Sequence, residues 1–262
     1  MTAHERANPQ EVSRFDFGGA ALRRGWPRLH AGDLEPWPEG RGAAAVQAAW
    51  RAFHEGRFAE AIDAGTACGA AGAAVANKAA GVHATYSALG AADATTLLRA
   101  AIARGEAAVL QQPEHANAHY GLAFVLGRYG QRISVAKALA DGLGGRVRVA
   151  LQRTLALQPG HAEAHVALGV FHAEVVDKVG ALAARIGYGA SREASIAAFE
   201  RARALAPLSP VACLEYARAL RRLDPKAAAR ARALLESAVA IEPADAMEAL
   251  DVNAARAELR AG

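Results

Sequence analysis

Internal repetition restricts the fold of this chain more than any other feature. The similar phrases VLQQP, LALQP, RALAP and VAIEP end at Pro113, Pro159, Pro207 and Pro243. Small or apolar residues recur at five, eight and twelve positions before these prolines, as Ala101, Gly105 and Ala108 do before the first. These offsets lie on one face of an α-helix. The repetition therefore predicts a series of helices, each ending at a proline.

The residues after the prolines repeat as well and predict where the next helices begin. Segment 112–119 is echoed by segment 158–165. Ser209 precedes Pro210 and Asp224 precedes Pro225, which places a capping side chain before a proline at the first helical position. Asp245 with Glu248 three residues later approximates a capping box. From residue 43 onward the chain is therefore expected to alternate between helices and turns.

The repeated pattern resembles the tetratricopeptide repeat (TPR), whose signature is W-x2-L-G-x2-Y, then A-x3-F, then P. The signature positions are matched by His165, Leu168, Gly169, His172, Ser195, Phe199 and Pro207, with histidines in the aromatic places. The residues Gly56-Arg57-Phe58 and Ala61 resemble the turn between the two helices of an earlier pair. The resemblance implies an all-α fold, an α-α superhelix or TPR-like solenoid of four to five helical hairpins, closed by a C-terminal capping helix near 245–259.

Two insertions distinguish the chain from a regular repeat array. The prolines at 113, 159, 207 and 243 are spaced by 46, 48 and 36 residues, whereas the usual repeat has about 34. The additional residues fall between the helices of a pair, at 133–145 and 175–189, and their composition predicts longer or additional helices. This combination resembles the regulator-of-microtubule-dynamics-like branch and, more loosely, the TPR subunits associated with TRAP transporters. The resemblance covers about 93–243; eukaryotic members of the first branch are associated with microtubules, and the transporter subunits are exported.

Residues 1–41 differ from the rest and are predicted to be an irregular N-terminal arm, followed by a TPR-like helical domain at 42–262. Several prolines and glycines make one continuous helix in the arm unfavourable. The arm also carries the large apolar residues Phe15, Phe17, Trp26, Leu29 and Trp37, which a disordered segment seldom has. We expect it to pack onto the helical domain, with its first ten residues flexible.

Composition excludes several function classes. The net charge of +4 is small, and no aromatic-plus-basic pattern indicates nucleic-acid binding. The 71 alanines favour close helix packing, and the two cysteines have no CxxC spacing. The N-terminal sequence lacks the apolar core of a signal peptide, and no apolar run is long enough to span a membrane. We expect a cytoplasmic protein that does not act on nucleic acid or membranes.

The first helix of each TPR pair lines the inner surface, so the register predicts a partner-binding groove with an apolar floor and charged rims. Its residues are Asn117, Tyr120, Phe124, Arg128, Glu163, Val166, Val170, Glu174, Leu214, Arg218, Arg221 and Arg222. These positions equally suit packing against the N-terminal arm or the C-terminal helix. A clamp for a peptide carboxylate from Asn77, Lys78, Asn117 and Arg128 is a weaker alternative, because their spacing does not match closely.

The histidines suggest a metal site only superficially. His115 and His119, like His161 and His165, are four residues apart, a spacing that places two imidazoles on one helix face. The repeat itself explains why the spacing occurs twice, and successive pairs would lie about 10 Å apart, too far for one ion. We therefore expect no metal and no other cofactor.

The function favoured by the sequence is a non-catalytic adaptor or scaffold that binds a protein or peptide in its groove. No phosphate-binding loop, G-x-S-x-G sequence or marked acid pair indicates an enzyme. One alternative is a receptor for a small or lipid-like ligand, walled off by the insertions. A second is a metal-dependent enzyme that uses the histidine pairs. The identity of the partner and the oligomeric state are left open.

Overall fold

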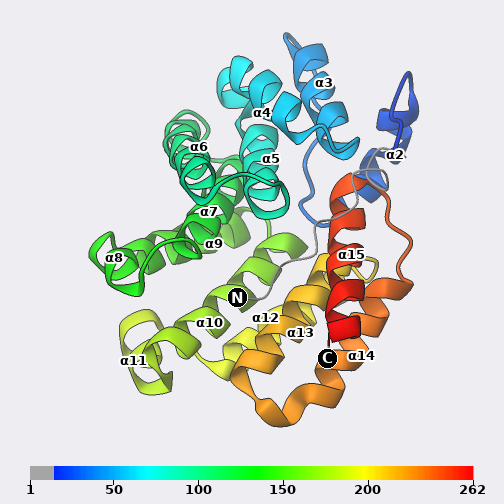
Figure 1. The fold of residues 1–262 in the computed structure, drawn as a ribbon. Coiled ribbons are helices and arrows are strands. Elements are labelled where there is room, and N and C mark those ends of the chain that lie inside the picture. Colours follow the sequence, from blue (N-terminus) through cyan, green and yellow to red (C-terminus); the bar gives the residue numbers. More distant parts are fainter. Residues whose placement is uncertain (1–14, 262) are drawn as a thin grey trace. The chain divides into compact units, whose positions relative to one another are not determined.

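The computed structural model describes residues 15–261, and every regular element in this range is a helix (Figure 1). The predicted flexibility of the first ten residues lies outside this range. The α-helices are α2 (Ala21–Leu29), α3 (Ala43–His54), α4 (Phe58–Ala67), α5 (Ala73–Tyr86), α6 (Ala91–Gln111), α7 (Ala116–Gly130), α8 (Val135–Ala140), α9 (Leu143–Leu157), α10 (Ala162–Val179), α11 (Ala181–Tyr188), α12 (Arg192–Leu205), α13 (Pro210–Leu223), α14 (Ala228–Ala240) and α15 (Ala246–Ala261). Two short 3-10 helices, η1 (Gly69–Gly72) and η2 (Pro225–Ala227), precede α5 and α14. The all-α prediction is confirmed for the described residues.

The chain divides into two compact units. Unit 1 contains Met1–His30, Leu34–Pro159 and the short segment Asp245–Met247. Unit 2 contains Ala31–Asp33, Gly160–Ala244 and Glu248–Gly262. This division differs from the predicted boundary after residue 41, because most of the arm packs with the first helical pairs.

Within each unit, helices that follow one another in the sequence form packed pairs. In unit 1 the pairs are α3 with α4, α5 with α6, and α7 with α9, and α5 also packs against α7. In unit 2 the pairs are α10 with α12 and α13 with α14, and α10 also packs against α13. Such nearest-neighbour packing is characteristic of helical repeats. The predicted succession of helical pairs is therefore confirmed within each unit.

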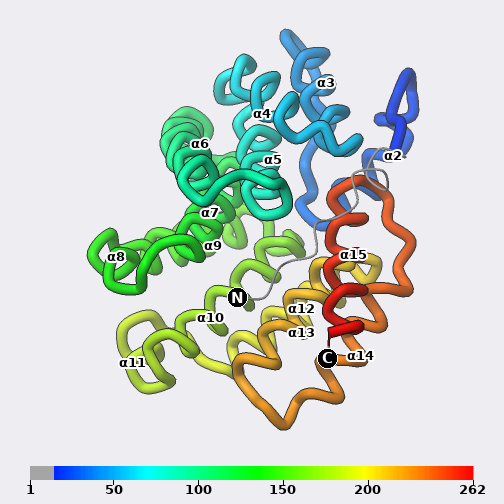
Figure 2. Tube along the Cα trace, viewed as in Figure 1, coloured from blue at the N-terminus to red at the C-terminus, as the bar shows by residue number. Residues whose placement is uncertain are grey.

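Both insertions form short helices. In the first, α7 ends at Gly130 and the separate helix α8 precedes α9. In the second, α10 is itself extended to Val179, and α11 follows after a single glycine (Figure 2). Gly180 adopts φ 80°, a value that favours glycine, so the chain can turn sharply between the two helices. The prediction of helical insertions is confirmed.

The residues of the repeat signature meet between α10 and α12. A Cβ atom on Gly169 would lie 2.7 Å from the ring of Phe199, so the two helices approach closely only because residue 169 has no side chain. The hydroxyl of Ser195 donates a hydrogen bond of 2.8 Å to the carbonyl of Gly169. Phe199 is fully buried in the core of unit 2 and stacks on Tyr216 of α13. Glycine at this signature position thus permits the close contact between α10 and α12.

Capping residues define several helix starts as predicted. The Ser209 side chain accepts a hydrogen bond from the amide of Ala212 at the start of α13. The Asp224 side chain accepts one from Lys226 in η2. At α15, however, Glu248 accepts a hydrogen bond from the amide of Ala244, one residue before Asp245. Glu248 thus bonds back to the chain just before α15, as the acidic member of a capping box does.

The N-terminal arm is more ordered than predicted. Residues 21–29 form helix α2, although Pro27 lies inside it and removes one backbone donor. Burial compensates for this loss, because Leu22 and Trp26 are almost fully buried. The Trp26 ring packs edge-on against Trp37 of the arm and Trp50 of α3, with centroids 4.8 and 5.9 Å away. The expected packing of the arm onto the helices is confirmed within unit 1.

Candidate functional site

Four of the predicted groove residues form a continuous strip along α7. Asn117 and Tyr120 are buried, whereas Phe124 and Arg128 are half-buried. The rings of Tyr120 and Phe124 stack with centroids 6.0 Å apart, and the guanidinium of Arg128 lies 5.1 Å from the Phe124 centroid. Tyr120, Phe124 and Arg128 are spaced by four residues, so they share a helix face. The structure therefore brings these four residues together; we call them the α7 strip.

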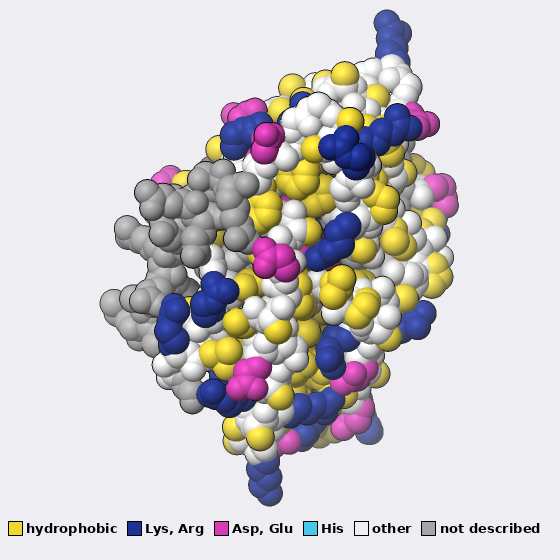
Figure 3. All heavy atoms as spheres, turned by 90° about the vertical axis from the view of Figure 1, so that its right-hand side faces the viewer, with side chains coloured by type: hydrophobic (Ala, Val, Ile, Leu, Met, Phe, Trp, Pro, Cys, Tyr) yellow, Lys and Arg dark blue, Asp and Glu magenta, His cyan; other side chains and the backbone are white. Residues whose placement is uncertain are grey.

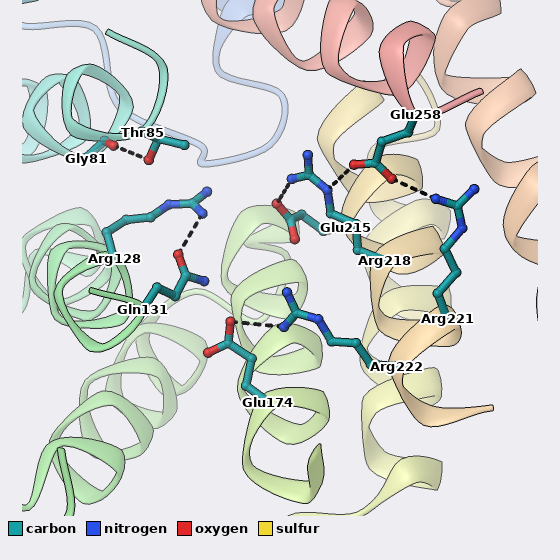
Figure 4. A network of polar contacts seen from close by, with 10 residues as sticks. All are labelled: Gly81, Thr85, Arg128, Gln131, Glu174, Glu215, Arg218, Arg221, Arg222 and Glu258. Carbon is teal, nitrogen blue, oxygen red and sulfur yellow. Dashed lines mark hydrogen bonds and ion pairs between the residues drawn. The ribbon is translucent and has the colours of Figure 1, made fainter. Parts of the chain in front are cut away.

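The neighbouring helix α5 fixes the position of the Phe124 ring. A Cβ atom on Gly81 would lie only 2.3 Å from Phe124 Cε1, so the ring occupies the space that a side chain would fill. At the end of the strip, Arg128 donates a hydrogen bond of 3.2 Å to Gln131 (Figure 4). The strip thus combines a held aromatic ring with a partly exposed cation, a combination that favours contact with another molecule.

The other end of the strip is covered by the chain's own arm. Asn117 donates a hydrogen bond of 2.6 Å to the carboxylate of Glu35, which is buried. His115 Nε2 lies 3.9 Å from the same carboxylate. Burial, with a smaller contribution from nearby His119, lowers the pKa of His115. His115 is therefore neutral at pH 7, and Glu35 is held at Asn117 by a hydrogen bond rather than by a strong ion pair.

The predicted groove residues of α10 lie in unit 2, where three of them contact the arm or the core of that unit. The backbone amide of Glu163 donates a hydrogen bond of 3.0 Å to the carbonyl of Gly32 in the arm. Val166 is a buried member of the core, and Val170 packs against that core. Contact with the arm was the alternative left open for these positions, and Glu163 makes that contact.

The predicted groove residues of α13 are also engaged within unit 2. Leu214 is completely buried, so the structure corrects its assignment to a partner-binding surface: its side chain is part of the core. Arg218 and Arg221 donate hydrogen bonds of 2.7 and 3.1 Å to opposite oxygens of Glu258 on α15 (Figure 4). The C-terminal helix therefore neutralises part of the arginine cluster.

The remaining arginine of that cluster bridges to α10. Arg222 lies 3.3 Å from the carboxylate of Glu174, another predicted groove residue. Arg218 also contacts Glu215 of its own helix at 2.9 Å. Three arginines thus face three glutamates, which removes most of the positive potential that a phosphate or carboxylate ligand would require. On the face drawn in Figure 3, basic and acidic side chains are likewise interspersed among apolar atoms.

The repeated histidines bond to the backbone. His119 lies 2.8 Å from the carbonyl of Pro113, which its Nε2–H reaches as a donor. His161 accepts a hydrogen bond from the amide of Ala164 and thereby caps α10. Within residues 15–261 there is no group of three or more side chains arranged to hold a metal ion. No helix in the same range is both long and apolar enough to cross a bilayer.

A buried polar cluster in unit 1 was not predicted. His54 Nδ1 lies 2.7 Å from the carboxylate of Asp245, and His54 Nε2 lies 3.2 Å from Nε2 of His30. All three side chains are almost fully buried. Burial lowers the pKa of His54, against the opposing effect of the hydrogen bond to Asp245. Neutral His54 therefore donates to Asp245 and accepts from His30.

No local sequence signal identifies this cluster, because its members are separated by 24 and 191 residues along the chain. The three segments that meet are the end of α2, the end of α3 and the residue before α15. The ring of Trp50 stacks on His54 with centroids 5.6 Å apart, and Lys78 is a further buried cation nearby. We interpret the cluster as a polar connection between distant segments of unit 1.

The fold and the site define an all-helical, helical-repeat-like protein with a half-exposed strip on α7. Residues 74–260 match the family described as Regulator of microtubule dynamics protein 1-3. Because the match covers most of the chain, the protein belongs to this family, as the sequence resemblance predicted. No curated protein matches the chain significantly.

Proposed function

We propose that this chain is a non-catalytic TPR-like solenoid protein that binds a protein or peptide partner along the α7 strip. The observation that carries the proposal is the row of Tyr120, Phe124 and Arg128, in which Phe124 and Arg128 are half-buried. Aromatic and arginine side chains dominate the energetics of protein interfaces. A strip of such residues on one helix face suits binding of an extended peptide or an amphipathic helix.

The packing of helices supports the TPR-like part of the proposal. Five consecutive pairs, from α3 with α4 to α13 with α14, pack as repeats do. The signature residues Gly169, Ser195 and Phe199 contact one another as close packing of a repeat pair requires. A binding role without catalysis is supported by the use of His119 and His161 in backbone hydrogen bonds.

A capture experiment tests the role of the strip. We expect Arg128→Glu to abolish capture of the partner, because the substitution reverses the charge and removes the cation from the Phe124 ring. Phe124→Ala is expected to weaken capture by about tenfold or more, as loss of an aromatic anchor does. Arg41→Glu, at an exposed arginine outside the strip, is the matched control and should leave capture unchanged. Equal capture by all four proteins would refute the assignment of the strip.

The family name adds microtubules as a specific class of partner. We therefore include a microtubule-related, cytoplasmic role in the proposal. Co-sedimentation of the purified chain with polymerised tubulin tests it directly. Binding that is lost in Arg128→Glu and retained in Arg41→Glu would support both parts of the proposal. If the chain does not sediment with microtubules, the microtubule role is wrong, whatever the capture experiment gives.

A further inference from the structure

Residues 34–37 of the arm, here called the cover segment, lie over one end of the α7 strip. The carboxylate of Glu35 accepts the hydrogen bond from Asn117, and the indole of Trp26 donates one of 2.8 Å to the carbonyl of Glu35. Gln158, after α9, donates a longer hydrogen bond of 3.4 Å to the carbonyl of Leu34. The cover segment therefore meets α7 and α9 through polar groups.

The cover segment leaves two buried polar atoms of its neighbours without hydrogen-bond partners among the described residues. Gln158 donates through Nε2, but its Oε1 is buried and has no hydrogen-bond partner within the described chain. Nδ1 of His115 is likewise buried without a partner among the described residues, whereas Nε2 of the same ring lies 3.9 Å from the Glu35 carboxylate. Buried polar atoms without partners cost free energy, and native proteins rarely retain them without a reason. A different occupant could satisfy both atoms.

The backbone of the cover segment is strained at Leu34. Its φ of 51° is the only positive value among the described residues other than glycine. The amide of Leu34 donates to the carbonyl of His30 at 2.8 Å, so it is already engaged and does not bond to the unpartnered Gln158 oxygen. The side chain of Leu34 is 40% exposed and returns little of the cost by burial. Strain of this kind concentrates at functional and switching segments.

We propose that the cover segment is an internal substitute for the partner, and that the partner is an extended peptide carrying an acidic side chain. This inference rests on the proposed function and specifies the chemistry of its ligand. An extended backbone offers a carbonyl and an N–H side by side. It can therefore bond to both ends of the Gln158 amide, which the left-handed conformation of Leu34 prevents. The acidic side chain takes the place of Glu35 at Asn117.

The arm is anchored by Trp26 and His30, which precede the cover segment, so the segment can leave without unfolding the arm. Trp26 and His30 are held in the buried aromatic and polar cluster around Trp50 and His54. The cover segment follows this anchor and is joined to α7 and α9 by the side chains of Asn117, His115 and Gln158. Exchange of the segment for a peptide breaks the contacts that Glu35 and Trp37 make with Trp26, which a peptide of the same sequence can remake, and it relieves the strain at residue 34.

Binding of a labelled peptide tests the inference with the full chain. The probe is a fluorescein-labelled peptide with the sequence of residues 33–38, and fluorescence anisotropy measures its binding. A second peptide, the glutamine twin, has glutamine in place of the glutamate. Glu35→Ala removes the internal competitor and is expected to bind the acidic peptide about tenfold more tightly than the wild type does. The glutamine twin should bind about tenfold more weakly, because it lacks the carboxylate that accepts the hydrogen bond from Asn117. Glu39→Ala, at an exposed acid of the same arm, should match the wild type.

Leu34→Gly gives a second test in the opposite direction, with a variant that relieves strain and should therefore fold. It stabilises the closed arm and is expected to weaken peptide binding about fivefold. Unchanged peptide binding in both Glu35→Ala and Leu34→Gly, or equal binding of the two peptides, would overturn the inference. Failure of the proposed function is a separate result: in the capture experiment, Arg128→Glu would capture as much partner as the wild type does.

Discussion

The buried connection between His54 and Asp245 supplies the sharpest prediction about stability. Asp245→Asn keeps the size of the side chain and the preference for a helix N-cap, but removes the charge. His54 then donates to a neutral amide oxygen instead of a carboxylate. A hydrogen bond to a charged group contributes about 1.5–3 kcal/mol and a neutral one about 0.5–1.5 kcal/mol. His54 and Asp245 are 1% and 3% exposed, so water cannot replace the lost interaction.

We therefore expect Asp245→Asn to lower the free energy of unfolding of unit 1 by about 1.5 kcal/mol. Urea unfolding followed by tryptophan fluorescence measures this change. The chain has three tryptophans, Trp26, Trp37 and Trp50, and all three belong to unit 1. With a typical slope of the unfolding free energy against urea concentration, the urea midpoint of unfolding should fall by roughly 0.5–1 M.

The matched control is Asp63→Asn, at an exposed aspartate of α4 in the same unit. Its effect should stay within about 0.5 kcal/mol, as is usual for surface substitutions. If Asp245→Asn destabilised unit 1 no more than Asp63→Asn does, the carboxylate would contribute nothing to the connection. The hydrogen-bond assignment for the cluster would then be wrong.

Three further predictions follow from the same structure. The folded-state pKa of His54 lies below its usual value of 6.5, chiefly through burial, so the unfolded chain binds the proton more readily. The contribution of neutral, buried His54 to the unfolding free energy is therefore fully present above pH 6.5. It is lost as the pH falls from 6.5 toward the folded pKa, by up to about 1.4 kcal/mol per pH unit. Urea midpoints at pH 7.5 and 5.5 check this, and equal midpoints would contradict it. Gly81→Ala should destabilise unit 1 by about 1–3 kcal/mol, because the new Cβ meets the Phe124 ring, whereas Gly127→Ala on α7 meets nothing within 4 Å and should be neutral or stabilising; thermal unfolding would show the opposite order if the packing were wrong. Ser209→Ala should cost about 1 kcal/mol through loss of the α13 cap, and Ser237→Ala, at an exposed position of α14, much less; circular dichroism in urea measures both, and equal losses would argue against a capping role.

The helical part of the fold could be predicted because its signals are local. The phrase that ends at Pro159 predicts the end of α9, and α10 begins at Ala162. Ser209 marks the start of α13 through a hydrogen bond to a residue three positions away. Gly169 belongs to the repeat signature, and its contact with Phe199 explains why that position has no side chain. Each signal depends on a short stretch of chain or on the spacing of one repeat.

The candidate site was predicted only in part. The register of α7 correctly placed Asn117, Tyr120, Phe124 and Arg128 on one face, because residues spaced by three or four positions share a helix face. The register could not show that Leu214 is enclosed by the core of unit 2. Nor could it show that Glu35, 82 residues away, covers Asn117.

The sequence by itself determined the helices, their order and the strip on α7, because helix formation and amphipathic spacing depend on neighbours within a few turns. Only the tertiary structure decided what covers those helices. Pairing of His54 with Asp245, of Glu35 with Asn117 and of Glu258 with two arginines joins residues distant in the chain. Such contacts form only when the folded chain brings distant residues together, and no periodicity in the sequence records them.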